Sequence, residues 1–353
     1  MSEKYEHAPS RPAPPAKNGR NSRGHPARSA LLGARGALLG RTPRRNVRVR
    51  AFAKINLTLR ILGVRADGYH ELRTTFQSIA LYDTLTFIAT PGAFRVECDD
   101  PACPTDRSNL VWQAAERMWR AAGRRGAPRD LVVRVEKRIP LQAGLGGGSS
   151  DAAAALRALA ALWRVEIPRD QMRSIASELG ADVPFFLDGG TALGVEHGDV
   201  LFPLLDAPAS WVVLVIPGFG VSTREAYGWF DEDRRAEALR HERGTKAPRH
   251  DRAERQLRAE RERISGTAGS GNDLQAPVSR HHPEIGRLVG ALRRLGASHA
   301  ALSGSGSAVF GLFGTRVAAA AAARAVAGRN RRPLVTRTLD RTRYARLARL
   351  RSG

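Results

Sequence analysis

Hydrophobic and polar residues alternate over most of one stretch near the start of the chain, between Val47 and Leu62. The apolar positions are Ala53, Ile55, Leu57 and Leu59, and the polar positions between them are Lys54, Asn56 and Thr58. A period of two residues is typical of a strand with one buried face. We therefore expect a strand over this stretch, with Lys54 and Asn56 on the same face.

The same periodicities predict further strands and helices along the chain. The expected strands are 78–88, 131–135, 211–216 and 308–313, and the expected helices are 109–122, 150–163, 169–179, 283–295 and 317–327. Gly180 is expected to end the helix 169–179 in a left-handed backbone conformation. The elements after about residue 200 indicate a second domain of mixed α and β structure.

The net charge of +23 lies mostly at the two ends of the chain. Residues 1–45 carry ten Lys or Arg against two acidic residues, and their Pro, Ala and Gly content predicts a disordered basic arm. The stretch 232–265 carries charges of both signs and is expected to be a solvated helix or a mobile insertion. The two domains are then expected at 46–200 and 201–345, followed by a basic tail at 346–353.

The composition excludes several classes of protein. No run approaches the roughly 18 apolar residues of a membrane-spanning helix, and no apolar signal core begins the chain. The two cysteines, Cys98 and Cys103, suggest neither a disulfide framework nor a zinc site. We therefore expect a soluble, cytoplasmic protein. An organellar transit peptide is an alternative for the Arg-rich N-terminus, although Ala, Arg and Gly are abundant throughout the chain.

A glycine-rich segment joins the expected strand 131–135 to the expected helix 150–163. Glycines let the backbone approach a polyanion closely, and the N–H groups at a helix N-terminus attract phosphate. Ser149 or Ser150 could cap the helix and offer a hydroxyl to phosphate or Mg²⁺. The segment lacks the Gly-Lys-Ser/Thr ending of a Walker A loop and the third glycine of a dinucleotide fingerprint. Taken alone, it could also be an ordinary glycine-rich turn.

Three segments taken together resemble the motifs of the GHMP kinases: Ala53–Leu57, Pro140–Ser150 and Gly304–Ser307. Their order and spacing also match this family. Arg65–Leu72 and Gly180–Phe186 make the chain most similar to those members that phosphorylate 4-diphosphocytidyl-2-C-methyl-D-erythritol. The resemblance covers about residues 47–345. It departs from the family at the arm and the charged stretch, and at Gln275, where the family often has Glu.

The resemblance implies an α+β, two-domain GHMP kinase fold. An N-terminal ribosomal-protein-like β/α domain is expected to be followed by a C-terminal ferredoxin-like α+β domain. The implied activity is ATP-dependent phosphorylation of the 2-hydroxyl of 4-diphosphocytidyl-2-C-methyl-D-erythritol, in the non-mevalonate isoprenoid pathway. ATP and Mg²⁺ are the implied cofactors. The expected partner is this small molecule, with no membrane and no specific nucleic acid, and the expected assembly is a monomer or a homodimer.

The resemblance also assigns roles to particular residues. Phosphoryl transfer needs a cradle for phosphates, a cation, and a carboxylate that accepts the hydroxyl proton. The expected cradle residues are Pro140, Leu141, Gln142, Ala143, Gly144, Leu145, Gly146, Gly147, Gly148, Ser149 and Ser150. Lys54 is the expected cation and Asp182 the general base, paired with Lys54 and kept ionised by it; Asp182 could instead only orient the hydroxyl. Tyr69 and His70 are expected to bind the cytidine end.

Each assignment has a plainer alternative. Lys54 could be a solvated lysine, Asp182 a turn former, and Tyr69 with His70 a packed aromatic and a turn histidine. Asn56 could hold a substrate hydroxyl, hold the Lys54 ammonium, or simply be a polar strand residue.

Two other functions also stay open. A GHMP kinase for homoserine, mevalonate or phosphomevalonate is one, although the Asp-Gly-Tyr-His segment argues against it. An RNA-binding protein is the other, because the N-terminal fold of these kinases is shared with ribosomal proteins and the chain is basic. The basic tails, however, carry few aromatic residues for base stacking.

Overall fold

Two long strands, β1 (Val47–Val64) and β2 (His70–Ala93), form an antiparallel pair at the centre of the larger sheet. The order β11-β1-β2-β4-β3 is extended by β5 on β2 and by β6 on β5, which makes seven strands. The other strands of this sheet are β3 (Arg95–Cys98), β4 (Arg129–Glu136), β5 (Thr191–Glu196), β6 (Val200–Pro203) and β11 (Arg351–Ser352). Among the strands described here for this sheet, only β3 and β4 pair in parallel.

The computed structural model describes residues 46–243 and 271–352. The predicted basic arm, 1–45, and residues 244–265 of the predicted charged insertion lie outside the described residues. The earlier part of that insertion belongs to a helix, α5 (Thr223–Arg243).

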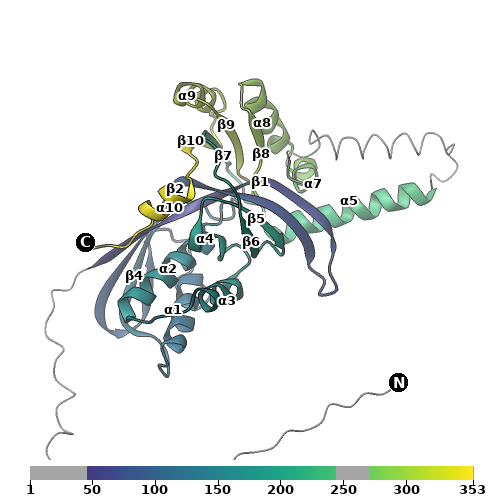
Figure 1. The fold of residues 1–353 in the computed structure, drawn as a ribbon. Coiled ribbons are helices and arrows are strands. Elements are labelled where there is room, and N and C mark those ends of the chain that lie inside the picture. Colours follow the sequence, from purple (N-terminus) through teal and green to yellow (C-terminus); the bar gives the residue numbers. More distant parts are fainter. Residues whose placement is uncertain (1–45, 244–270, 353) are drawn as a thin grey trace, which may run out of the picture. The chain divides into compact units, whose positions relative to one another are not determined.

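Helices cover one face of the seven-stranded sheet (Figure 1). They are α1 (Leu110–Ala121), α2 (Gly147–Trp163), α3 (Arg169–Leu179) and the short α4 (Phe185–Asp188). The Ala-rich α2 packs closely because small side chains let its backbone approach the sheet, and its residues from Ala152 to Leu156 are all buried. Asn109 caps α1 by accepting the N–H of Val111 at 2.8 Å.

A second sheet has four strands in the order β10-β7-β9-β8. These strands are β7 (Trp211–Pro217), β8 (His299–Leu302), β9 (Val309–Phe313) and β10 (Arg331–Arg337). The helices of this part are α7 (Gln275–His281), α8 (Pro283–Arg294) and α9 (Arg316–Ala325). Helix α10 (Arg341–Leu347) packs instead on the larger sheet, where Tyr344 lies against Phe52 of β1. Apolar residues of α7, α8 and α9 pack with the inward residues of β7, β8 and β9 in one core.

A third core cluster joins the two sheets. Ile55 and Ile79 of the first sheet pack with Leu214 and Phe310 of the second, and all four side chains are fully buried. The predicted domain boundary near residue 200 stays a prediction, because residues 44–353 form one unit of contacts. Within the predicted basic tail, Arg351 and Ser352 pair with β1 as strand β11 and so belong to the larger sheet.

Several expected elements begin or end elsewhere in the structure. The strand expected at 78–88 starts at His70, because the polar residues before Ser78 pair with both β1 and β5. The helix expected at 150–163 starts at Gly147, and its cap is Gly146 rather than Ser149 or Ser150. Gly180 ends α3 with φ 159° and ψ 151°, an extended glycine conformation instead of the expected left-handed one.

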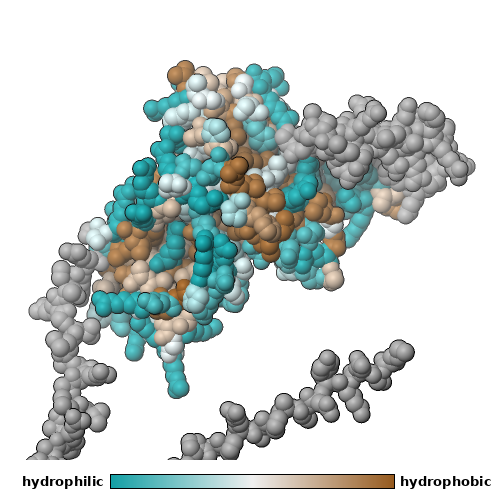
Figure 2. All heavy atoms as spheres, in the orientation of Figure 1, coloured by the Kyte–Doolittle hydropathy of each residue, from teal (hydrophilic) through white to brown (hydrophobic). Residues whose placement is uncertain are grey.

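Apolar side chains gather near the centre of the face in Figure 2, in the region of β5 and β6. Val200 and Phe202 on β6 are 38% and 53% exposed, and Leu205 after this strand is 96% exposed. In the part of the chain that the structure describes, no helix has both the length and the apolar character needed to cross a membrane.

Candidate active site

The glycine-rich segment before α2 touches a second glycine segment, residues 303–307, backbone against backbone. A Cβ atom on Gly144, which has φ 75°, would lie 2.0 Å from the carbonyl oxygen of Ser303. A Cβ on Gly306 would lie 2.1 Å from the nitrogen of Gly144. Ser303 Oγ donates to the Gly144 carbonyl at 3.0 Å, and the Ala308 N–H donates to Ala143 at 3.1 Å. Glycine at both positions is therefore required for this contact.

The N-terminus of α2 begins directly after this contact. Gly146 caps the helix in a left-handed conformation, with φ 70° and ψ 26°, and no side chain accepts from the first helical N–H groups. Such N–H groups, together with the helix dipole, favour a negatively charged ligand. The hydroxyl of Ser150 is not available to such a ligand, because it is buried and donates to the Phe52 carbonyl at 2.7 Å. Ser149 lines the adjoining cavity.

A buried charge cluster holds the base of the glycine-rich segment. Lys137 Nζ lies 2.5 Å from Asp83 Oδ2 and 2.8 Å from Asp151 Oδ2, and all three side chains are at most 6% exposed. Asp83 also accepts the N–H groups of Arg138 and Ile139 at 2.5 and 2.8 Å. The cluster therefore links β2, the exit of β4 and the first turns of α2, on both sides of the glycines.

This cluster contains two carboxylates for one ammonium group, and Oδ1 of Asp151 has no hydrogen-bond partner. Burial raises the pKa of Asp151 to about 7, against the opposing attraction of Lys137. The sequence analysis assigned no role to these residues. A buried aspartate and a surface aspartate look alike in one sequence, so nothing in the pattern singled them out.

Lys54 and Asp182 meet at the bottom of a cavity. Lys54 Nζ lies 3.2 Å from Asp182 Oδ2, and the lysine side chain is only 4% exposed while Asp182 is 33% exposed. Lys54 Nζ also donates to Asn56 Oδ1 at 2.6 Å, so the expected shared face of these two residues is confirmed. Asn56 in turn donates to Thr74 Oγ1 at 2.7 Å. The ammonium group is thus held in one position by a buried network.

The cavity above Lys54 and Asp182 has a volume of about 290 Å³. Its wall includes residues from both glycine segments, from the larger sheet and from α5: Asn56, Leu59, Thr74, Ser149, His197, Thr223, Gly304 and Ser305. A second cavity, of about 580 Å³, is lined by Tyr69 and His70. The two cavities share five wall residues, which are Leu72, Ala181, His197, Thr223 and Tyr227. The two cavities therefore adjoin, and the rest of their walls is lined by different residues.

Tyr69 and His70 differ in how firmly they are held. Tyr69 is 67% exposed, and its ring meets the edge of His197 at 5.4 Å between centroids. Its backbone N–H donates to Asp67 at 3.0 Å, which lowers the pKa of that carboxyl. His70 is stacked on Tyr227 at 4.9 Å, with 28° between the ring planes. Burial raises the pKa of the Tyr227 hydroxyl, with a smaller contribution from Asp182.

The second glycine segment is anchored by α7 and the turn before it. Asn272 is buried, and its Nδ2 donates to the carbonyls of Leu302 and Gly304 at 3.0 and 2.6 Å. Gln275 Oε1 accepts the N–H of Leu302 at 3.0 Å. A glutamate oxygen could accept this same hydrogen bond, which explains how Gln can stand where the family often has Glu.

The structure brings six of the sixteen residues singled out from the sequence to the two cavities. Lys54, Asn56, Asp182 and Ser149 line the smaller cavity, and Tyr69 and His70 line the larger one. The sequence analysis missed the shared wall residues His197, Thr223 and Tyr227. A hint was available for the last two, since they are four residues apart at the start of a helix and therefore share a face.

Models of two protein families match the chain. The description "GHMP kinases N terminal domain" applies to residues 109–190, and "GHMP kinases C terminal" to residues 252–331. Among solved structures, a homoserine kinase from Cytophaga hutchinsonii is 18% identical with a TM-score of 0.54, over 83% of this chain and 95% of that one. At this identity the likeness concerns the fold alone. These matches confirm the expected two-domain GHMP kinase fold class.

Closer relatives share one name. The 4-diphosphocytidyl-2-C-methyl-D-erythritol kinase of Solibacter usitatus is 44% identical over 77% of this chain and 83% of its own length. The enzyme of the same name from Moorella thermoacetica is 42% identical over 74% of this chain and 88% of its own length. A crystal structure of 4-(cytidine 5'-diphospho)-2C-methyl-D-erythritol kinase is 35% identical, with a TM-score of 0.62, over 82% of this chain and 98% of that one. The chain therefore belongs to the GHMP kinases, and within them to the 4-diphosphocytidyl-2-C-methyl-D-erythritol kinase family.

Proposed function

We propose that this protein transfers the γ-phosphoryl group of ATP to the 2-hydroxyl of 4-diphosphocytidyl-2-C-methyl-D-erythritol. The observation that carries the proposal is a pair of adjoining cavities, one with an ion pair for phosphoryl transfer in its wall and the other with stacked rings in its wall. The acceptor has the same two-ended character, with a polyol at one end and a pyrimidine at the other. Family membership supports the same substrate.

The phosphates of ATP would lie against the N-terminus of α2 and the two glycine segments. The close approach of Gly144 and Gly306 keeps side chains out of this region, and the unpaired N–H groups at the start of α2 suit phosphate oxygens. Mg²⁺ usually keeps several waters and takes one or two protein oxygens beside the phosphates. The Ser149 hydroxyl and the Asp182 carboxylate, both in the wall of the smaller cavity, fit this donor set.

Lys54 and Asp182 carry the chemical step in this proposal. The Lys54 ammonium, which is held by Asn56 and Asp182, stabilises the charge on the transferred phosphoryl group. Asp182 accepts the proton of the 2-hydroxyl or orients that hydroxyl for attack; a loose transition state needs little deprotonation. Because the Lys54 ammonium is held by Asn56 and Asp182, it needs little reorganisation to stabilise the transferred group.

Tyr69 and His70 bind the cytidine end in this proposal. Aromatic faces provide a stacking surface for a pyrimidine, and ring nitrogens and backbone groups provide hydrogen bonds for its edge. His70 is held more firmly than Tyr69, because it is packed against Tyr227 and Phe230. The exposed Tyr69 is expected to close over the base when the substrate binds.

The test is a direct assay of product. Purified full-length protein is incubated with ATP, Mg²⁺ and the cytidyl substrate, and the product is identified by mass spectrometry and ³¹P NMR. The expected product carries one new phosphate, on the 2-position. Homoserine and mevalonate are assayed in parallel through ADP release. Faster turnover of either acceptor than of the cytidyl substrate would overturn the proposal.

A further inference from the structure

One side of α5 faces the larger cavity. Thr223, Tyr227 and Asp231 are spaced by four residues and so lie on one stripe of this helix. Thr223 lines both cavities and contacts Ser305 Oγ at 2.9 Å, and Tyr227 stacks on His70. Asp231 continues this stripe. The sequence had placed Asp231 at the edge of a charged stretch expected to be solvated, but its Oδ1 lies 2.8 Å from Nε2 of His70.

The His70 ring is fixed from three directions. Tyr227 stacks on one face, Phe230 meets it edge-on at 6.0 Å, and Asp231 bonds to Nε2. The side chain is 13% exposed, whereas Asp231 is 38% exposed. His70 also separates the larger cavity from a further one of about 400 Å³, which is lined by Asp231. Such a ring has little freedom to rotate, so the state of its second nitrogen matters to a ligand.

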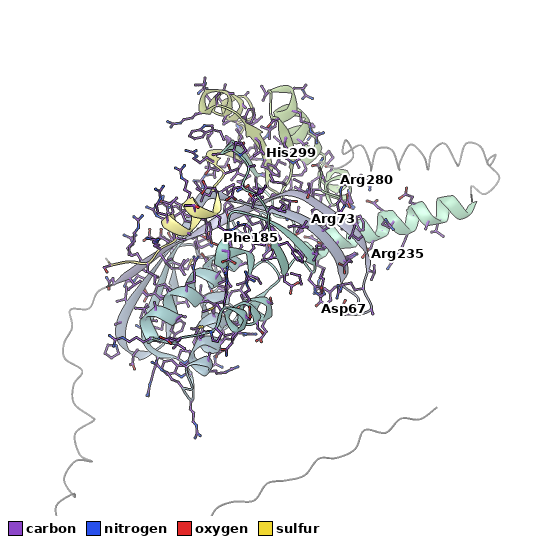
Figure 3. All side chains as sticks on the ribbon, viewed as in Figure 1. Asp67, Arg73, Phe185, Arg235, Arg280 and His299 are labelled. Atoms are coloured by element: carbon purple, nitrogen blue, oxygen red, sulfur yellow. The ribbon has the colours of Figure 1, made fainter. Side chains whose placement is uncertain are left out.

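Figure 3 shows the surroundings of this contact. Asp67 marks the tip of the β1–β2 hairpin, and Arg235 marks the neighbouring part of α5. The further cavity is lined by residues from both of these elements, Gly68 and Arg235 among them. The hairpin that carries Tyr69 and His70 therefore lies against α5, and the bond from Asp231 to His70 joins the two.

The chemistry of the pair determines which ring nitrogen carries the proton. An ionised carboxylate can only accept a hydrogen bond, so Nε2 of His70 must donate to Asp231. In the neutral ring Nδ1 is then unprotonated and can only accept. Within residues 46–243 and 271–352, Nδ1 has no hydrogen-bond partner. His70 lines the larger cavity, and the ring nitrogen that it has left for a ligand is an acceptor, not a donor.

An acceptor distinguishes the two common pyrimidines. Cytosine has an exocyclic amine that donates, whereas uracil has a carbonyl oxygen at the same place. A site built to pair with a donor discriminates strongly against an analogue that lacks it, because the buried polar group is then left unpaired. We propose that Asp231 is a positioning residue that selects cytosine over uracil, by holding His70 in the tautomer whose Nδ1 accepts the cytosine amine. This inference rests on the proposed function and names the residue behind its base specificity.

The first test observes the tautomer directly. Full-length protein labelled with ¹⁵N at histidine gives long-range ¹H–¹⁵N correlations that report which ring nitrogen is protonated, and a His70→Ala spectrum assigns the signal among the nine histidines. In the wild type, we expect the His70 ring to have a protonated Nε2 and an unprotonated Nδ1. Asp231→Ala should give a mixture of the two tautomers. A wild-type ring with Nδ1 protonated would overturn the inference.

The second test measures base preference. Affinities for CDP and UDP are measured with the nucleotide site saturated by a nonhydrolysable ATP analogue, in the wild type, Asp231→Ala and Asp231→Asn. Asp231→Ala should raise the KM for the cytidyl substrate and reduce the preference for CDP over UDP, each by about tenfold, with the KM for ATP and kcat within about twofold. Across the three proteins, the preference for CDP over UDP should increase with the fraction of His70 rings whose Nδ1 is unprotonated.

Glu232→Ala is the matched control, because Glu232 is exposed on the same turn of α5. It should leave the tautomer and the preference unchanged. If the preference for CDP stayed constant while the tautomer changed, Asp231 would only anchor the helix, and the inference would be overturned. If the wild type bound neither CDP nor UDP and did not turn over the cytidyl substrate, the proposed function would fail, and the base selection would fail with it.

Discussion

Lys54 Nζ lies 3.2 Å from Oδ2 of Asp182, although one residue sits on the central strand β1 and the other follows α3. The two side chains differ greatly in exposure, at 4% and 33%. The lysine is therefore fixed by the protein, while the carboxylate keeps one side open to the cavity. This asymmetry suits a charge stabiliser that stays in place and a base that must reach a substrate hydroxyl.

Asp182→Asn should lower kcat by about 10² or more and leave the KM for ATP within about threefold. The amide cannot accept a proton, but it keeps the size of the side chain. Asp188→Asn is a matched control, because Asp188 is 35% exposed and pairs with Arg169 and Arg173 outside the cavities. Steady-state kinetics of both variants measure kcat and the KM for ATP, and only Asp182→Asn should show the loss of kcat. Equal losses in both variants would point to a folding effect rather than to catalysis.

Lys54→Met should also lower kcat by about 10² or more, because the charge opposite the transferred phosphoryl group is lost. Methionine fills much of the same buried space, so the fold should be kept. Circular dichroism checks folding, and a fluorescent ATP analogue checks nucleotide binding. Near-normal turnover by a folded variant would remove Lys54 from the catalytic residues.

Asp151→Asn should change how stability depends on pH. Burial raises the pKa of Asp151 to about 7 from about 3.9 in an unfolded chain, so the folded state holds the proton more tightly. The stabilisation from the protonated carboxyl is complete below about pH 4 and is lost as pH rises through about 7. The free energy of unfolding of the wild type should therefore fall relative to that of the variant over this interval.

Urea unfolding at pH 5, 6, 7 and 8 measures this difference. Asp170→Asn is the control, because Asp170 is exposed in the first turn of α3 and should show no such trend. A constant difference between wild type and Asp151→Asn across the four pH values would mean that Asp151 stays ionised throughout, held by Lys137 alone.

Gly306→Ala should weaken both stability and ATP binding. The added Cβ would lie 2.1 Å from the nitrogen of Gly144, so the two glycine segments must move apart. We expect a loss of about 1–3 kcal/mol in the free energy of unfolding and a KM for ATP raised by about tenfold or more.

Gly286→Ala serves as the control for this variant, because Gly286 lies within α8 and its nearest neighbour, Ser279, is 3.5 Å from the added Cβ. A glycine in a helix is less favourable than alanine by about 1 kcal/mol, so this change should be neutral or stabilising. Unchanged ATP affinity in a folded Gly306→Ala protein would contradict the phosphate role of the glycine segments.

The local patterns of the sequence were enough to find most of the elements and several of the site residues. Alternation over Val47–Leu62 correctly placed Lys54 and Asn56 on one face of a strand. Helical spacing found α1, α3 and α8 to within one residue at each end. These patterns arise because burial of one face of an element places apolar residues at a regular spacing along the chain.

Polar strands and cap residues were harder to predict. The residues from His70 to Gln77 form a strand because they pair with β1, and Leu72 to Gln77 also pair with β5; few of them show apolar alternation. Ser150 resembled a cap in sequence, but its hydroxyl bonds the Phe52 carbonyl from another element. In both cases the deciding partner is far away in the chain.

The sequence by itself determined the two glycine segments, the strand that carries Lys54 and the family to which these motifs point, because each depends on residues close together in the chain. Tertiary structure alone decided the contacts of Lys137 with Asp83 and Asp151, and the contact of Asp231 with His70. The pairing of Lys54 with Asp182 was expected from the resemblance, and the structure gives its distance, 3.2 Å. Whether a charged side chain is solvated, buried in a pair or aimed at a cavity depends on what packs against it. The surroundings of a charged side chain are set by burial and pairing between distant segments, and local periodicity contains no information about them.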